Sequence, residues 1–230
     1  MRVTHENLNR KNFTEVNTTS NNANVNVNVN VNVINIGDAS GSMRSYNKYE
    51  TLKQGIRQEL EICKNLNFNF SFIEFIQSGF VKQWEWNQDP NKVTLFFNGA
   101  MGGNTPLYQT VYDVIQKCLN EKNPNQQYLI KVFTDGADNS SGGYMSKLVK
   151  LLQELKENPK FTVVFIASST DMPHITRALQ LDESNTQVHE NTGESIKEVY
   201  ANELINMATY STRLANNEDV RSSYFTKTKL

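Results

Sequence analysis

The sequence predicts one doubly wound α/β domain, with a mostly parallel six-stranded sheet, one antiparallel edge strand and helices on both faces. Three observations support this fold class. Apolar patterns of the strand type and of the helix type alternate along the chain from residue 31 onward. Two strand patterns, at 68–76 and 80–86, are joined by a short turn and indicate a hairpin. The other strands are separated by helices, which implies parallel pairing with helices on both faces.

The length and composition fit one such domain. The 230 residues suit a single α/β domain with flexible ends, or at most two small domains. Hydrophobic residues make up 38% and charged residues 20%, which is the profile of a globular protein. The formal net charge of −1 provides no strongly basic field that would attract nucleic acid, so we expect no nucleic-acid partner.

The sequence shows no signal of export or membrane insertion. The first residues contain no apolar segment of the signal-peptide type, and the longest apolar stretches, such as 161–167, are too short to cross a bilayer. Cys63 and Cys118 fall in helical patterns without metal-like or redox-like spacing, so we expect buried free thiols. These features predict a cytoplasmic protein with no membrane partner, while export by an unusual route stays open.

Residues 1–30 are expected to form a disordered polar tail that ends in an Asn–Val repeat. Asn and Val alternate without a break from Asn24 to Val33, which is a strand pattern, but buried amide groups need hydrogen-bond partners. We therefore expect 31–36 to be the first strand. A shift of two residues leaves the repeat unchanged, so the sequence after Ile36 must set the register of this strand.

The first helix and the hairpin follow from apolar spacing. A helix is expected at 49–66, because its apolar residues recur at helical intervals. These residues are Leu52, Ile56, Leu60 and Cys63. The strands at 68–76 and 80–86 are joined by the turn Gln77-Ser78-Gly79, which makes the pair antiparallel.

The second half of the chain continues the alternation. A helix at 105–119 has a strong start signal, because Pro106 falls in its first turn. The apolar run at 161–167 is typical of a strand covered on both faces. The other expected elements are strands at 128–134 and 186–189 and helices at 144–155, 173–181 and 194–214. The domain is therefore expected at 31–214, followed by a frayed polar tail at 215–230.

Three polar loops lie at the ends of these elements. Asp38-Ala-Ser40-Gly-Ser42 follows the first strand, and a loop that contains Thr105 precedes a helix. Asp135 follows a central strand directly. Ligands of such sheets bind at the carboxyl ends of the strands, near the point where the strand order reverses. All three loops should therefore open at one edge of the sheet.

The residue types in these loops suit a hard divalent cation. Hydroxyl and carboxylate oxygens bind Mg²⁺, Mn²⁺ or Ca²⁺ in preference to Zn²⁺. Asp38, Ser40 and Ser42 are spaced two residues apart, which sends their side chains to one side of an extended segment. Thr105 would add a third hydroxyl, and Asp135 a second carboxylate, directly or through water. A metal would also supply a counter-charge for Asp38 at the buried end of a central strand.

The pattern Asp38-x-Ser40-x-Ser42, with Thr105 and Asp135, resembles the metal-ion-dependent adhesion site (MIDAS) of von Willebrand factor A (VWA) domains. The flanking segments DASGSM, GGNTPLY and FTDGADN match as well, and the resemblance covers about 31–214. It is closest to small stand-alone members from bacteria and phages. The resemblance implies a Rossmann-like fold and a bound metal whose open position takes an Asp or Glu of another protein. The Asn–Val repeat departs from the family, whose first strand is usually apolar on both sides.

Simpler interpretations exist for each residue alone. Thr105 is a candidate helix cap, Asp135 could belong to an ordinary turn, and Ser40 and Ser42 could be loop serines. Asp138 and Asn139 could line the metal site or belong to a solvated loop. Three spaced motifs on the expected elements favour the metal site over these separate interpretations.

The sequence leaves three functions to compare. The favoured one is a metal-dependent protein-binding module without enzymatic activity. A hydrolase or phosphotransfer enzyme that uses Asp38 and the metal is the alternative, because this fold also hosts such enzymes. Against it, Asp38 replaces the first glycine of a Gly-x-Ser-x-Gly motif, no Walker loop occurs, and no His or Lys is recognisable as a base near the loops. A structural role without metal is the third possibility.

Overall fold

The computed structural model describes residues 30–77, 80–99 and 103–225. Its sheet has the strand order β3-β2-β1-β4-β5-β6. The strands are β1 (Asn30–Asp38), β2 (Asn69–Gln77), β3 (Phe80–Gln88), β4 (Gln126–Phe133), β5 (Phe161–Ser168) and β6 (Thr186–His189). The helices are α1 (Lys48–Leu66), α2 (Leu107–Asn120), α3 (Tyr144–Leu155), α4 (Met172–Leu179), α5 (Gly193–Ala201) and α6 (Glu203–Ala215). Short 3₁₀ turns are η1 (Gly41–Asn47), η2 (Pro90–Lys92) and η3 (Glu183–Asn185).

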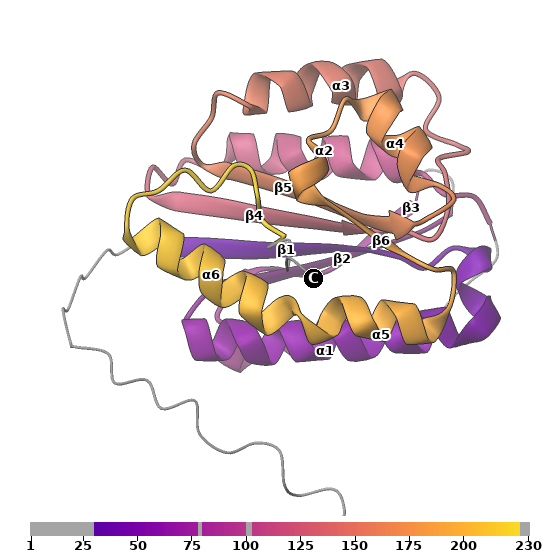
Figure 1. Cartoon of the computed structure of the whole chain (residues 1–230), viewed down its shortest axis with the longest axis horizontal. Coiled ribbons are helices and arrows are strands. Elements are labelled where there is room, and N and C mark those ends of the chain that lie inside the picture. The colour runs from indigo at the N-terminus through magenta and orange to yellow at the C-terminus, as the bar shows by residue number, and fades with distance from the viewer. Residues whose placement is uncertain (1–29, 78–79, 100–102, 226–230) are drawn as a thin grey trace, which may run out of the picture.

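The molecule has three layers, with the sheet between two layers of helices (Figure 1). Helices α1, α5 and α6 cover one face, and α2, α3 and α4 cover the other. All strand pairs are parallel except β2 with β3, which form the antiparallel hairpin at the edge. The predicted fold class is therefore confirmed.

Strand β1 lies in the middle of the sheet, parallel to both β2 and β4. The prediction that the first strand is central is confirmed. The chain moves from β1 toward β2 and β3, and then crosses to β4 on the other side of β1. The strand order therefore reverses between β1 and β4, and the carboxyl ends of these two strands flank the position where ligands of this fold class bind.

The Asn–Val repeat reaches the described residues only from Asn30, and the predicted tail before it lies outside them. Val31 and Val33 face the core under α1, whereas Ile34 faces the core under α2 and α3. Asn32 is fully buried, and its side-chain oxygen accepts a 2.9 Å hydrogen bond from the hydroxyl of Ser71. The carbonyl of one buried Asn therefore has the partner that its burial requires.

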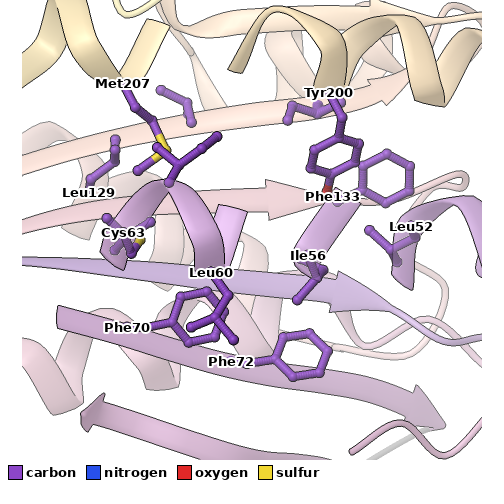
Figure 2. Packing of buried hydrophobic residues seen from close by; sticks show 14 of the residues in the cluster. Leu52, Ile56, Leu60, Cys63, Phe70, Phe72, Leu129, Phe133, Tyr200 and Met207 are labelled. Carbon is purple, nitrogen blue, oxygen red and sulfur yellow. The ribbon is translucent and has the colours of Figure 1, made fainter. Parts of the chain in front are cut away.

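The core on the α1 side confirms the predicted helical spacing. Leu52, Ile56 and Leu60 of α1 point toward the sheet (Figure 2). They meet a set of buried residues from two strands and two further helices (Figure 2), namely Phe70, Phe72, Leu129, Phe133, Tyr200 and Met207. Cys63 and Cys118 are buried free thiols, as predicted, and burial raises the pKa of both. No helix in the described part of the chain is long and apolar enough to cross a membrane.

The predicted single helix at 194–214 is wrong, because the chain breaks at Asn202 into α5 and α6. The backbone N–H of Asn202 bonds to the carbonyl of Val199, three residues back. Glu203 starts α6 and is fully buried, with Oε2 2.5 Å from the ammonium of Lys131. The break accompanies a buried ion pair that apolar periodicity does not reveal.

The expectation of a frayed tail is also wrong for 216–225. This segment returns to the domain, where Val220 and Tyr224 are buried. The hydroxyl of Thr162 donates to the Val220 carbonyl at 2.9 Å, and the hydroxyl of Tyr224 donates to Glu203 at 2.8 Å. Phe225 packs against the same core cluster, so three apolar residues within a polar stretch hold this segment on the domain.

Candidate metal centre

The predicted ligands come from three loops, and two of these loops leave β1 and β4 at the switch point. Asp38 ends β1 and is buried, as is Ser40, whereas Ser42 in η1 is exposed. Asp135 lies two residues after β4, and its side chain is buried. Thr105 is buried in the loop before α2.

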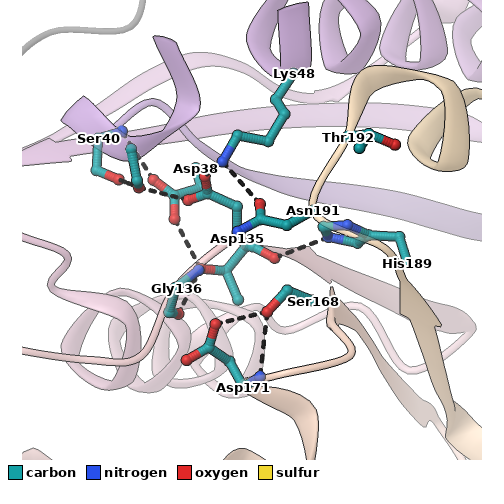
Figure 3. Close-up of polar contacts among 12 residues, drawn as sticks. Asp38, Ser40, Lys48, Asp135, Gly136, Ser168, Asp171, His189, Asn191 and Thr192 are labelled. Carbon is teal, nitrogen blue, oxygen red and sulfur yellow. Dashed lines mark hydrogen bonds and ion pairs between the residues drawn. The ribbon is translucent and has the colours of Figure 1, made fainter. Parts of the chain in front are cut away.

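Four of the five predicted residues form one hydrogen-bonded network (Figure 3). The backbone N–H of Ser40 donates to Oδ1 of Asp38 at 2.8 Å. The hydroxyl oxygens of Ser40 and Ser42 are 3.1 Å apart, and Ser42 donates to Oδ1 of Asp135 at 2.6 Å. Within the first motif, the side chains of Ser40 and Ser42 therefore meet, and Asp38 joins them through the backbone of Ser40.

Thr134 holds the Asp38 carboxylate from the other side. Its hydroxyl donates to Oδ2 of Asp38 at 2.7 Å. Burial raises the pKa of Asp38 to about 6, and the nearby charge of Asp135 adds to the rise, while the bonds from Ser40 and Thr134 oppose it. The only sequence signal for Thr134 is its position directly before Asp135 in FTDG.

Lys48 is a second residue that the sequence patterns do not reveal. Its ammonium group bonds to Oδ2 of Asp135 and, at 2.7 Å, to the side-chain oxygen of Asn191 (Figure 3). A lysine therefore lies beside the loops, and these bonds go to side-chain oxygens. Lys48 begins α1 only six residues after Ser42, and a turn with positive φ at Tyr46 (55°) and Asn47 (58°) folds it back against the site.

The backbone of Thr105 bonds to Asn139 in the third loop. Its backbone N–H donates to the side-chain oxygen of Asn139 at 2.7 Å, and Asn139 N–H donates to the Thr105 carbonyl at 3.2 Å. Within the described residues, the Thr105 hydroxyl makes no hydrogen bond to the other four predicted ligands. Asn139 therefore ties the second loop to the third and sets the position of Thr105.

Helix α2 starts at Leu107, and Pro106 rather than Thr105 occupies its N-cap position without a capping side-chain bond. Asp138 of the third loop supplies that bond instead, because its Oδ2 accepts a 2.8 Å hydrogen bond from the backbone N–H of Tyr108. The hydroxyl of Ser141 also donates to Asp138, and its oxygen accepts from the N–H of Gln109 at 2.9 Å. Asp138 is thus a structural residue of the third loop, and the loop satisfies backbone groups at the start of α2.

The donor set fits a hard divalent cation. Mg²⁺–oxygen distances of about 2.0–2.1 Å place neighbouring octahedral ligands about 3 Å apart. The separation of 3.1 Å between Ser40 Oγ and Ser42 Oγ matches this spacing. The described residues contain no group of three or more His, Cys, Asp or Glu side chains that could hold a metal. An ion at this position would therefore need serine and threonine hydroxyls in addition to the two carboxylates, and this oxygen set suits Mg²⁺, Mn²⁺ or Ca²⁺.

No protein-family model matches the sequence, and no curated protein matches it either. Solved structures do resemble the fold. The SpRpn10 VWA domain aligns with a TM-score of 0.54 at 13% identity, covering 78% of this chain and 95% of that domain. This chain has the VWA fold. The fold that the sequence resemblance implied is therefore confirmed.

Two longer proteins contain a similar fold. Proximal thread matrix protein 1 from the mussel byssus aligns with a TM-score of 0.58 at 17% identity, covering 78% of this chain and 47% of that one. The pilus adhesin SpaC from Lactobacillus rhamnosus GG aligns with a TM-score of 0.57 at 13% identity, covering 77% and 30%. This VWA-fold chain thus spans about half of the first protein and less than a third of the second. At these identities the likeness shows the fold alone.

Proposed function

We propose that this VWA-fold chain is a protein-binding module that depends on a divalent cation. The cation is Mg²⁺, with Mn²⁺ or Ca²⁺ as alternatives, and its ligands are Asp38, Ser40, Ser42, Thr105 and Asp135. The partner is a protein that presents an Asp or Glu side chain, and we propose that the two meet in the cytoplasm without nucleic acid or membrane. The observation that carries the proposal is the hydrogen-bonded chain from Ser40 through Ser42 to Asp135.

The exposure of the site supports binding to a partner. Asp38 and Ser40 are buried, whereas Ser42 is exposed, so the network extends from the core to the surface. When bound, the metal supplies a positive centre for an anionic oxygen, because the hydroxyl ligands add no charge of their own. Thr134 and Lys48 orient the two carboxylates from behind. These residues supply at most five ligands to the metal, and the sixth position of an octahedral Mg²⁺ is left for a partner carboxylate.

The contacts support binding rather than hydrolysis or phosphotransfer. Both oxygens of Asp38 accept hydrogen bonds, and both oxygens of Asp135 do so as well. His189 is buried and stacks on Phe133 at 5.1 Å between ring centroids, and its ring nitrogens face backbone carbonyls. These groups are held in structural contacts, so none of them is poised as a general base.

Affinity capture from the native cell, in Mg²⁺ and in EDTA, tests the proposal. We expect a partner that is retained in Mg²⁺ and released by EDTA. Thr105→Ala removes a ligand and should abolish retention, while Thr105→Ser keeps the hydroxyl and should preserve it. Helix α2 is capped by Asp138 and not by Thr105, so Thr105→Ala should leave the helix start intact. Retention that survives both EDTA and Thr105→Ala, in a protein shown to be folded, would place the interaction on another surface.

A further inference from the structure

Lys48 is a buried cation directly behind the proposed metal site. Its side chain is 3% exposed and extends from the start of α1 to a position between Asp135 and Asn191 (Figure 3). Oδ2 of Asp135 accepts from this ammonium group, while Oδ1 of the same carboxylate accepts from Ser42. Asp135 thus separates the lysine from the hydroxyl ligands.

This position is unfavourable for a lysine unless its charge has a use. Removal of an ammonium group from water is costly, and an ion pair only partly compensates for it. Lys48 is also the first residue of α1, where the positive end of the helix dipole opposes a cation. The preceding turn holds two non-glycine residues, Tyr46 and Asn47, in the left-handed region, which adds backbone strain. Three separate costs therefore accompany the placement of this one charge.

Resting on the proposed function above, we propose that the positive charge of Lys48 makes the metal-bound site require an acidic partner. The hydrogen-bonded network contains Asp38 and Asp135 with one negative charge each and Lys48 with one positive charge, so its sum is −1. A divalent ion brings the sum to +1, and one partner carboxylate then brings it to zero. Without Lys48 the loaded site would already be neutral and would attract an anion less strongly.

The same charge lowers the affinity of the site for the metal itself, and this effect is measurable without any partner. Calcium and terbium ions have similar radii but charges of two and three, and both can be titrated by calorimetry. Lys48→Met removes the charge and keeps an unbranched side chain, and we expect it to tighten Ca²⁺ binding about tenfold or more. The logarithm of the gain in affinity should be about 1.5 times as large for Tb³⁺ as for Ca²⁺, because Coulomb energy is proportional to the charge of the ion. Lys48→Arg keeps the charge and should bind both ions about as the unmodified protein does.

A merely structural lysine would give another result. After its loss Ca²⁺ affinity would stay the same or fall, with no dependence on ion charge, whatever the change in melting temperature. That outcome, in a protein that binds Ca²⁺ before mutation, would overturn the role of Lys48 and leave the proposed function standing. If neither ion binds to the unmodified protein or to any variant, the metal site and the proposed function fail together.

Lys48→Met leaves Asp135 buried without its cation, and this variant can therefore fail to fold. A second comparison covers that case. Asp135→Asn alone gives a network charge of zero, and Asp135→Asn combined with Lys48→Met gives −1 without an unpaired buried aspartate at 135. The double variant should bind Ca²⁺ about tenfold more tightly than Asp135→Asn alone. Equal affinity of the two would overturn the proposal.

Discussion

The hydroxyl of Thr134 donates to Oδ2 of Asp38 at 2.7 Å, and this bond joins the ends of the two strands between which the sheet order reverses. Thr134 directly follows β4, and Asp38 is the last residue of β1. The backbone N–H of Ser40 donates to the other oxygen of Asp38, so the carboxylate is held from both sides. The geometry of the candidate site therefore depends on a residue outside the ligand motif.

Thr134→Val should destabilise the metal-free protein by about 1–3 kcal/mol, because it removes a hydrogen bond to a buried carboxylate and keeps the shape of the side chain. It should also weaken metal binding, since Asp38 would lose one of the contacts that orient it. Urea unfolding and metal titration measure the two effects. Thr134→Ser keeps the hydroxyl and is the matched control. Equal stability of all three proteins would show that this bond does not hold Asp38 in solution.

Divalent metal should raise the free energy of unfolding. Binding to the native state alone contributes RT ln(1 + [L]/Kd), so ~100-fold excess over Kd should add about 2.7 kcal/mol. Asp38→Ala should abolish this increment, because it removes a carboxylate of the proposed ligand set. Asp171→Ala is a suitable control, since Asp171 accepts from Ser168 beside α4 and should leave the increment unchanged. A melting temperature that Mg²⁺, Mn²⁺ and Ca²⁺ all fail to move would contradict the metal site.

The stability of the metal-free protein should depend on pH through Glu59. Lys131 lies between Glu59 and Glu203, with both N–O distances at 2.5 Å, and all three side chains are buried. Burial raises the pKa of Glu59 to about 7, and Glu203 adds to the rise while Lys131 opposes it. The folded state therefore holds a proton on Glu59 more tightly than the unfolded state does. The stability from Glu59 is fully present below about pH 4.5 and is lost as the pH rises through about 7.

Glu59→Gln provides the test of this pH dependence, because glutamine has a similar shape and stays neutral. In EDTA, urea unfolding of the unmodified protein should show a free energy that falls across this pH range by more than that of Glu59→Gln. Parallel curves for the two proteins would mean that Glu59 has the same pKa in the folded and the unfolded state. Glu61→Gln, which removes an exposed acid from the same helix, should reproduce the unmodified curve.

The packing of α1 against α5 should be sensitive to one methyl group. A Cβ atom added at Gly55 would be 2.4 Å from the ring of Tyr200, which is buried. Gly55→Ala should therefore cost about 1–3 kcal/mol, although alanine favours the helix by ~1 kcal/mol. Gly136→Ala is the control, because an added Cβ there meets nothing within 4 Å. Thermal unfolding that is unchanged by Gly55→Ala would indicate that Tyr200 shifts without cost.

Local patterns were sufficient to predict most elements and the order of the three loops. The helical spacing of Leu52, Ile56 and Leu60 matches the buried face of α1, and the hairpin is the antiparallel edge. Polar contacts between distant segments were not predictable in the same way. Lys48 and Asn191 are 143 residues apart in sequence, and the ion pair of Lys131 with Glu203 joins β4 to α6. Charged residues carry no periodic signal that distinguishes a buried pair from a solvated one.

The sequence by itself determined the sheet class, the central position of β1 and the shared motif Asp38-x-Ser40-x-Ser42, because hydrophobic periodicity and loop spacing are local properties of the chain. Only the tertiary structure decided that Thr134 and Lys48 hold the carboxylates of the candidate site. It also decided that the segment 216–225 returns to the domain, where the hydroxyl of Tyr224 bonds to the buried Glu203. Those contacts form when parallel strands align their ends and when helices pack against the sheet. An unpaired polar group is costly once it is buried, and which partner a group can reach depends on the whole fold.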